Sequence, residues 1–296
     1  MRKKVLIIAI VVLLFILVAP AWYFSSQLLF PTVKPCPKDH FIFCGDPSER
    51  GLPFREVSFT SKDGIRLSGW LVPAASKKAV IMVHGIGASR NEGMRWAKAL
   101  HDAGLNVLLF DLRNGGKSGK AVTGMGMYEK EDVRAALDYL LRAEKMNSVG
   151  VFGVSMGAAS GIPAMAEDGR IAAGVFEAGY ADLWDLLSVM IVRDYHLPKF
   201  PLLHMTALMF RLRGGISMAE VSPEKYIDDI APRPVFVIHC KDDHFIPYEN
   251  GERLYKAAKE PKEFYTAACK IHAQAWQSDG KMLEKRIAGF FLKNLK

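Results

Sequence analysis

The sequence predicts an α/β fold with a mostly parallel central sheet, helices on both faces and a helical cap. Three observations support this. Short apolar runs alternate with amphipathic segments from residue 54 to the end of the 296-residue chain. An alternating apolar and polar stretch opens this region, and one Met-rich segment at about 180–222 interrupts the rhythm. Strands that alternate with helices favour parallel pairing, and the chain is long enough for one large domain with a full core.

The elements are assigned from apolar periodicity. Alternating side chains on both sides of Lys62-Asp63-Gly64 predict a β-hairpin, and continuous apolar runs predict strands buried on both faces. Apolar residues every three or four positions predict helices. Pro163 predicts that the helix after Ser155 is short or kinked. The hairpin covers 55–60 and 65–72; the buried strands cover 79–83, 106–110, 149–152, 171–176, 234–239 and 264–269; and helices cover 92–103, 128–143, 249–258 and 282–295.

The N-terminal segment predicts a membrane anchor. Arg2-Lys3-Lys4 precedes residues 5–19, which contain no charged or polar side chain, and three aromatic residues follow at 22–24. A run of roughly 20 apolar residues can span a bilayer, and the basic start predicts that the N-terminus stays inside. The alternative is a secretory signal peptide cleaved at Ala19-Pro20-Ala21. Both interpretations place the rest of the chain outside the cytoplasm. The predicted organisation is an anchor at 1–24, a juxtamembrane linker at 25–53 and a domain at 54–296.

Charge and cysteine content bear on the partners and the compartment. The net charge is +8, but the basic residues are spread along the chain. This favours mild attraction to an anionic membrane surface, or an ordinary charged surface, over nucleic-acid binding. Cys36 and Cys44 lie in a Pro-rich stretch that a disulfide could close, while Cys240 and Cys269 each end a predicted strand. The second pair bridges the two strands if these are adjacent, and otherwise the two residues are buried free thiols.

One pentapeptide, Gly153-Val154-Ser155-Met156-Gly157, follows a buried strand and precedes a small-residue stretch. A nucleophilic serine on a sharp strand–turn–helix connection needs this setting. The turn lifts the hydroxyl above the sheet edge, and Gly153 and Gly157 avoid clashes that larger side chains would cause. The first backbone N–H groups of the next helix then face the group that the hydroxyl attacks. The pattern therefore predicts that Ser155 is a nucleophile, provided that a base and an acid lie near it.

Two later residues can supply that base and acid. A serine hydroxyl needs a base within hydrogen-bonding reach, and the base needs a carboxylate to fix its tautomer. Asp243 and His272 each follow the end of a predicted strand, as Ser155 does. Because the carboxyl ends of parallel strands meet at one edge of a sheet, we expect the three side chains to lie together. We predict Ser155 as the nucleophile, His272 as the general base and Asp243 as the orienting acid, with Asp242 as the alternative acid.

The chain order Ser, Asp, His and several spaced motifs resemble the α/β-hydrolase family over the whole predicted domain. His84-Gly85-Ile86-Gly87 resembles the H-G-x-G oxyanion turn of that family. Residues 111–118 resemble its D-x-R-G-x-G-x-S motif, with Asn114 where a glycine is usual; Asn tolerates a left-handed backbone. Residues 239–247 resemble H-G-x-x-D-x-x-V-P, and this register makes Asp243 the acid.

The resemblance implies a hydrolase fold and roles for further residues. The backbone N–H groups of Ile86 and Met156 would form an oxyanion hole, and His84 and Gly85 would support the turn. Gln27-Leu28-Leu29-Phe30-Pro31, after an N-terminal anchor, is similar to the membrane-anchored Bem46-like branch of the family. The sequence contains no phosphate-binding glycine loop, so we expect no cofactor. No group of His, Cys, Asp or Glu has metal-ligand spacing, so we expect no metal.

The predicted function is that of a membrane-tethered serine hydrolase for lipophilic esters or thioesters. The cap segment lies between two predicted strands, where Met190, Met205 and Met209 offer mobile apolar side chains to an acyl group. Packing of the cap on the domain explains these methionines equally well. Two other functions remain open: a serine peptidase or amidase with the same triad, and a non-catalytic binding protein on the same fold.

Overall fold

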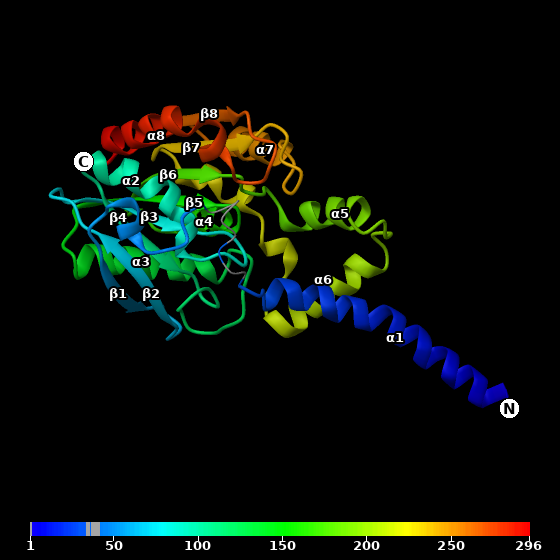
Figure 1. The fold of residues 1–296 in the computed structure, drawn as a ribbon. Coiled ribbons are helices and arrows are strands. Elements are labelled where there is room, and N and C mark those ends of the chain that lie inside the picture. The colour runs from blue at the N-terminus through cyan, green and yellow to red at the C-terminus, as the bar shows by residue number, and fades with distance from the viewer. Residues whose placement is uncertain (1, 34–35, 37–41) are drawn as a thin grey trace.

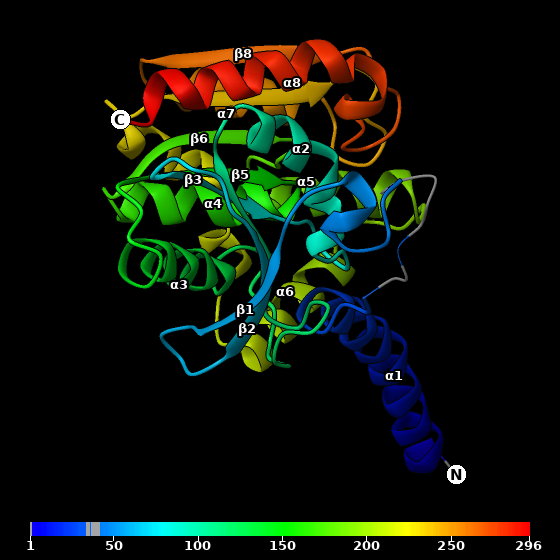
Figure 2. The ribbon, with the colours of Figure 1, turned by 60° about the vertical axis from the view of Figure 1, so that its left-hand side comes forward.

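The computed structural model describes the backbone of residues 2–33, 36 and 42–296, and the side chains of these residues except 2, 6, 8–14, 16 and 17. A central sheet with helices on both sides forms the body of the molecule (Figure 1). A long N-terminal helix extends away from this body, so that the two termini lie at opposite ends in both views (Figures 1 and 2).

The sheet and its helices have the following bounds. The strands are β1 (Arg55–Thr60), β2 (Arg66–Val72), β3 (Lys78–Val83), β4 (Asn106–Asp111), β5 (Ser148–Val154), β6 (Ile171–Glu177), β7 (Val235–Cys240) and β8 (Lys262–Ala267). The helices are α1 (Arg2–Leu29), α2 (Met94–Asp102), α3 (Glu129–Arg142), α4 (Met156–Glu167), α5 (Leu183–Arg193), α6 (Leu202–Gly214), α7 (Glu249–Ala257) and α8 (Ala275–Asn294).

The strands form one eight-stranded sheet in the order β1-β2-β4-β3-β5-β6-β7-β8. The pairs β1/β2 and β2/β4 are antiparallel, and all the other neighbours are parallel. The predicted fold class, with its opening hairpin and mostly parallel sheet, is therefore confirmed. Parallel pairing brings the carboxyl ends of β3, β5, β7 and β8 to one edge, and the loops that carry the predicted site follow these ends.

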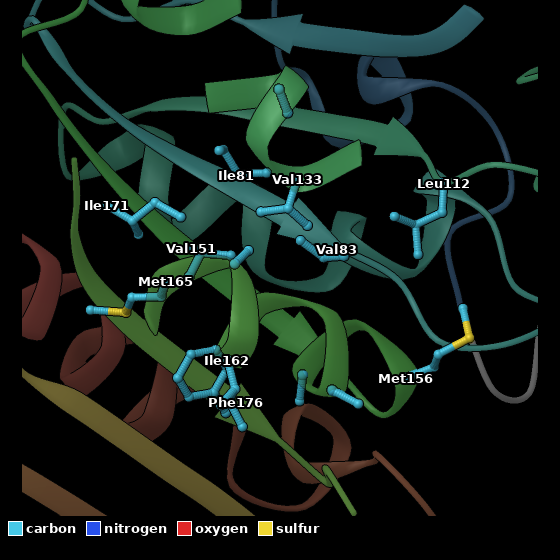
Figure 3. Close-up of a cluster of buried hydrophobic side chains, with 14 of the residues drawn as sticks. Ile81, Val83, Leu112, Val133, Val151, Met156, Ile162, Met165, Ile171 and Phe176 are labelled. Atoms are coloured by element: carbon cyan, nitrogen blue, oxygen red, sulfur yellow. The ribbon is translucent and has the colours of Figure 1, made fainter. Parts of the chain in front are cut away.

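Two apolar cores cover the two faces of the sheet. Successive side chains of a strand point to opposite faces, so Val149 and Val151 of β5 join one core while Phe152 and Val154 join the other. The helices α3, α4 and α7 pack in the first core, and α2 and α8 pack in the second. Figure 3 shows the first core, where Ile162 and Met165 of α4 lie near strand side chains such as Phe176. Helices on both faces bury nearly every residue of the middle strands, which explains their continuous apolar sequence.

The helix α4 corrects one expectation. Pro163 predicted a short or kinked helix, but α4 continues past it to Glu167. The residues from Met156 to Met165 are all buried, so packing on both sides stabilises the helix against the lost hydrogen bond at the proline. The last helix contains an additional first part from Ala275; the backbone is kinked at Asp279, and the helical part after this kink covers the predicted residues from 282 onward.

The structure does not confirm the predicted transmembrane helix. In the described part of the chain, no helix combines the length and the apolar character that a membrane crossing requires. Part of the predicted span lies outside the described side chains. The helix α1 continues five residues beyond the predicted end at 24, and its C-terminal half packs along α6 (Figures 1 and 2). This half is therefore part of the folded body.

The segment between β6 and β7 holds α5 and α6, where the sequence predicts a helical cap. Both helices lie on the side of the molecule from which α1 projects (Figure 1).

The structure shows which of the cysteines form disulfides. Disulfides join Cys36 to Cys44 and Cys240 to Cys269, and no described cysteine is free. The second bridge connects β7 to the loop after β8, because these two strands are adjacent in the sheet.

Candidate active site

Ser155 occupies the sharp turn between β5 and α4. Its φ is 55°, in the left-handed region that side chains with a Cβ rarely adopt. A Cβ on Gly153 would lie 2.3 Å from the carbonyl oxygen of Gly157, and a Cβ on Gly157 would lie 2.1 Å from that of Val83. Only glycine fits at these two positions, because the obstacles are backbone atoms. The strained turn is thus held by close packing, which is typical of a functional residue.

Three side chains from different strand ends meet at this turn. The Nε2 atom of His272 lies 2.9 Å from Ser155 Oγ, and its Nδ1 atom lies 2.7 Å from Asp243 Oδ2. The carboxylate of Asp243 accepts the Nδ1 proton, which leaves Nε2 free to accept the proton of the serine hydroxyl. The Asp243 side chain is fully buried, whereas 16% of the His272 side chain is exposed. The structure thus brings together the three residues that the sequence predicts as a triad.

The loop after β7 holds the carboxylate of Asp243 in place. Its Oδ1 atom accepts the backbone N–H groups of Phe245, at 2.9 Å, and Ile246, at 3.0 Å. Burial opposes the negative charge, but the hydrogen bond and the charge of His272 outweigh it, so the pKa of Asp243 lies below its usual value. Asp242, the alternative acid, is exposed and makes no side-chain contact with His272 in the described structure. The geometry therefore selects Asp243.

The two other histidines near the acid have structural positions. His239 is fully buried and donates from Nε2 to the carbonyl of Ile246, at 3.0 Å. Burial lowers the pKa of His239, which keeps its ring neutral beside the acid loop. His244 is exposed, with Nδ1 at 3.3 Å from the carbonyl oxygen of Lys270. Neither ring contacts Ser155.

The predicted oxyanion turn lies against the nucleophile. A Cβ on Gly85 would lie 3.1 Å from Ser155 Cβ, which is a tight contact, so glycine favours this close approach of the turn. His84 supports the turn: its Nε2 accepts the backbone N–H of Leu112 at 3.0 Å, and its Nδ1 donates to the carbonyl of Gly85 at 2.7 Å. Met156 is the first residue of α4, where a backbone N–H has no intrahelical partner. The predicted donors Ile86 and Met156 thus follow directly after the two residues, Gly85 and Ser155, that lie against each other.

The loop after β4 also supports the predicted oxyanion turn. Asn114 has φ 62°, so the residue that replaces the usual glycine of this motif does adopt the left-handed backbone. Asp111 accepts from the backbone and the guanidinium of Arg90, and both residues are buried. This pair fixes the β4 loop beside His84, and through His84 it supports the oxyanion turn.

A buried charged cluster near the triad was not predicted from the sequence. Glu92 accepts the backbone N–H of Gly85 at 2.7 Å, and it lies 3.7 Å from the guanidinium of Arg95. Arg95 donates at 2.6 Å to the carbonyl of Ala273, the residue after the predicted base. Glu177 accepts from Ala275 N at 3.2 Å and also from Trp96. Burial raises the pKa of Glu177 despite the charge of Arg95.

This cluster connects the catalytic loops to one another. Glu92 and Arg95 join the oxyanion turn to the loop of His272. Glu177 adds the turn of Ser155, because its own carbonyl accepts the backbone N–H of Ser155 at 2.9 Å. Glu92, Arg95 and Glu177 are all at most 3% exposed. No local sequence signal indicates such a cluster, since charged residues in a sequence usually mark the surface.

An apolar pocket of about 360 Å³ opens beside the site. Its walls come from α1, from the cap helices, from the oxyanion turn at Ile86 and from the acid loop at Phe245. Met190 lines it, as the sequence predicts for an acyl pocket, but Met205 and Met209 are not among its lining residues. The difference arises because α6 turns Leu203 and Thr206 toward the pocket instead.

Comparisons with known proteins agree with this geometry. A sequence profile described as the alpha/beta hydrolase fold matches residues 78–197. The uncharacterized protein YqkD of Bacillus subtilis is 32% identical over 232 residues, which is 77% of this chain and 75% of YqkD. The chain belongs to the α/β-hydrolase family. The uncharacterized protein YfhR of Escherichia coli K12 is 27% identical over 81% of both chains.

Solved structures give the same result. The esterase PF2001 of Pyrococcus furiosus is 25% identical, with a TM-score of 0.73 over 91% of this chain and 98% of that one. Est1E of Butyrivibrio proteoclasticus, solved with ferulic acid bound, is 18% identical with a TM-score of 0.63 and shows the fold alone. It covers 80% of this chain and 99% of that one. The neighbours do not confirm the finer Bem46-like assignment.

Proposed function

We propose that this α/β-hydrolase is a serine esterase that cleaves lipophilic carboxylic esters or thioesters through an acyl-enzyme. The hydrogen-bonded chain from Asp243 through His272 to Ser155, at the rim of an apolar pocket, carries this proposal. The similarity to an esterase of known structure, at 25% identity over most of both chains, supports the same reaction class.

The geometry suggests the following steps. His272 Nε2 takes the proton of Ser155 Oγ as this oxygen attacks the ester carbonyl, and the imidazolium is stabilised by the carboxylate of Asp243. The N–H groups of Ile86 and Met156 hold the negative oxygen of the tetrahedral intermediate. His272 then gives its proton to the departing alcohol or thiol, which leaves an acyl-Ser155 ester. A water molecule, deprotonated by His272, attacks that ester and releases the acid.

Hydrolysis of p-nitrophenyl esters and labelling with a fluorophosphonate test the proposal. We expect the wild type to cleave these esters and to be labelled at Ser155, and Ser155→Ala to lose both properties. Ser148→Ala is a matched control, since Ser148 begins the same strand, far from the turn, and is equally buried. A wild type that neither cleaves short esters nor reacts with the phosphonate contradicts the proposal. Faster cleavage of aminoacyl amides than of esters would instead favour a peptidase or amidase.

We further propose that the N-terminal helix attaches the enzyme to a membrane, with the domain outside the cytoplasm. The apolar run at 5–19 supports attachment, as do the exposed side chains of Phe15, Phe200 and Leu212 on α1 and the cap. The two disulfides fit an oxidising compartment. The similarity of residues 27–31 to the Bem46-like branch is consistent with this arrangement.

Membrane attachment is tested by fractionating cells that express the full chain. We expect the protein in the membrane fraction after a high-salt wash, and we expect protease added to cells without their wall to digest the domain. Recovery in the soluble fraction contradicts attachment, and protection from the protease contradicts the proposed side of the membrane.

A further inference from the structure

The pocket beside Ser155 has an unexpected wall. Four of its lining residues, Tyr23, Phe24, Gln27 and Leu28, belong to α1, the segment that the sequence assigns to an anchor and a linker. The opposite wall consists of cap side chains, including Leu187 and Met190 of α5 and Leu203 of α6. The pocket exists only because α1 and the cap lie against each other.

This part of α1 is fixed to the cap by specific contacts. Arg213 of α6 donates to the carbonyl of Trp22 at 3.0 Å and to the hydroxyl of Ser25 at 2.7 Å, and its guanidinium lies 3.7 Å from the centre of the Trp22 ring. Leu29 is fully buried and packs so closely on α6 that a Cβ on Gly214 would lie 2.5 Å from it. A polar clamp and a close helix contact therefore hold the wall in one position.

Phe24 ties the wall to the far side of the pocket. Its ring packs edge to face on Tyr195, at 4.9 Å between ring centres, and Tyr195 follows α5 in the chain. Both residues line the pocket. Phe24 thus lies where the wall from α1 meets the wall from the cap, and its ring faces whatever occupies the space between them.

The pocket adjoins the catalytic site through two of its lining residues. Ile86, whose backbone N–H belongs to the proposed oxyanion hole, lines it. Phe245 lines it too, and its ring lies 5.1 Å from the imidazole of His272. An ester bound with its carbonyl at Ser155 therefore has one substituent directed between α1 and the cap. The walls are mostly apolar, which suits a hydrocarbon chain.

We propose that the C-terminal half of α1 forms one wall of the acyl-binding pocket and that Phe24 determines acyl-chain preference. The volume of about 360 Å³ is at the small end of the range for ligand pockets, so the occupant is a single acyl chain of medium length. This inference rests on the proposed esterase function. It adds that the N-terminal helix selects the substrate, independently of the proposed attachment to a membrane.

The test measures kcat/KM of the full chain for p-nitrophenyl acetate, butyrate, octanoate and palmitate. We expect octanoate to be the preferred ester of the wild type. In Phe24→Ala, the preference for octanoate over acetate should fall about tenfold, since a lost apolar contact in a pocket weakens discrimination by about that factor. Phe15→Ala is the matched control: Phe15 lies on the same helix, is 72% exposed and does not line the pocket. Its acyl preference should equal that of the wild type.

A second variant guards against misfolding of Phe24→Ala. Met190→Phe adds a ring from the opposite wall and should move the optimum to butyrate. A small ethyl fluorophosphonate, which needs no acyl pocket, should still label Ser155 in all three variants, which shows that their triads are assembled. A second ester series, with the acyl group fixed as acetate and the alcohol lengthened, should respond equally in wild type and variants.

The outcomes separate this inference from the function on which it rests. If the phosphonate fails to label the wild type, the esterase proposal is wrong. If labelling is intact but Phe24→Ala and Met190→Phe keep the wild-type acyl profile, the wall on α1 is overturned. A change confined to the alcohol series also overturns it, because the pocket then holds the leaving group. If Phe15→Ala changes the acyl profile as much as Phe24→Ala does, then Phe24 does not determine acyl-chain preference.

Discussion

The triad and the pocket beside it are built in opposite ways. Around the triad, buried polar groups hold one another: Asp243 accepts two backbone N–H groups, and the Glu92–Arg95 pair joins the loops on both sides of Ser155. The pocket is walled by apolar side chains of α1 and the cap, many of which are partly exposed, such as Tyr23 and Tyr195. The difference teaches that the loops at the sheet edge position the triad, whereas α1 and the cap, far apart in the sequence, form the pocket that we propose selects the substrate.

The largest effect on the triad side should come from its acid. Asp243→Asn keeps the shape but favours the wrong tautomer of His272, so kcat should fall about 10⁴-fold for every ester, with no change in acyl preference. Asp242→Asn is the matched control, because Asp242 is adjacent and exposed. Steady-state kinetics on the acyl series measures both. An equal loss in the two variants would mean that the wrong carboxylate has been assigned.

The two disulfides offer the next comparison. The Cys240–Cys269 bridge closes a separation of 29 residues and lies three residues before both Asp243 and His272, whereas Cys36–Cys44 closes 8 residues outside the sheet. Replacing Cys240 and Cys269 by alanine should lower the free energy of unfolding by about 3.5 kcal/mol. Replacing Cys36 and Cys44 by alanine should lower it by about 2.5 kcal/mol.

Urea unfolding checks these two values, and kinetics adds a second distinction. We expect kcat to fall only when the bridge beside the acid and base is removed. If removal of Cys36–Cys44 lowers kcat equally, then the bridge at the sheet has no special part in positioning the triad.

The buried cluster near the triad should have a graded effect. Glu92→Ala removes both the acceptor for Gly85 N and the partner of Arg95, so the oxyanion turn shifts and kcat should fall roughly 10²-fold with little change in KM. Glu92→Gln keeps an acceptor oxygen and should recover part of that loss. Kinetics and thermal unfolding of both variants separate positioning from stability. A parallel fall in KM and kcat, or no recovery with Gln, contradicts the positioning role.

The smallest effect should come from the clamp on α1. Arg213→Met loses the hydrogen bonds to Trp22, Ser25 and Ser26 but keeps an apolar stem, so α1 should loosen without leaving α6. We expect KM for octanoate to rise about fivefold, which corresponds to about 1 kcal/mol, while kinetics with acetate stay unchanged. Arg211→Met, on the same helix turn and exposed, is the control. Equal changes for acetate and octanoate would show that α1 supports the triad rather than the pocket.

The two regions also differ in how far the sequence predicts them. Ser155, Asp243 and His272 each follow an apolar run that ends abruptly, and parallel pairing dictates that such ends meet. The wall on α1 could not be predicted, because apolar residues such as Tyr23 and Leu28 suit a lipid environment and a helix interface equally well. The prediction that Pro163 shortens or kinks its helix was wrong for a related reason. The local effect of the proline on the helix is outweighed by burial on both sides, which no local pattern reveals.

The charged cluster lay beyond prediction for a different reason. Glu92 and Glu177 stand in segments whose neighbours are apolar or mixed, and a single acidic residue there is ordinarily assigned to the surface. Their partners, Arg95 and the loop after His272, are distant from Glu177 in the sequence by 82 residues or more. Only the packing of α2 and α8 on the same face brings them together.

The most direct test of the account is the detection of an acyl-enzyme on Ser155. The full chain is mixed with excess p-nitrophenyl octanoate, quenched in acid within the first turnovers and digested for mass spectrometry. We predict that the peptide containing Ser155 gains the mass of one octanoyl group, that the adduct maps to the Ser155 hydroxyl, and that it is absent from Ser155→Ala. Product formation without this adduct, or with an unchanged rate in Ser155→Ala, would contradict the central claim.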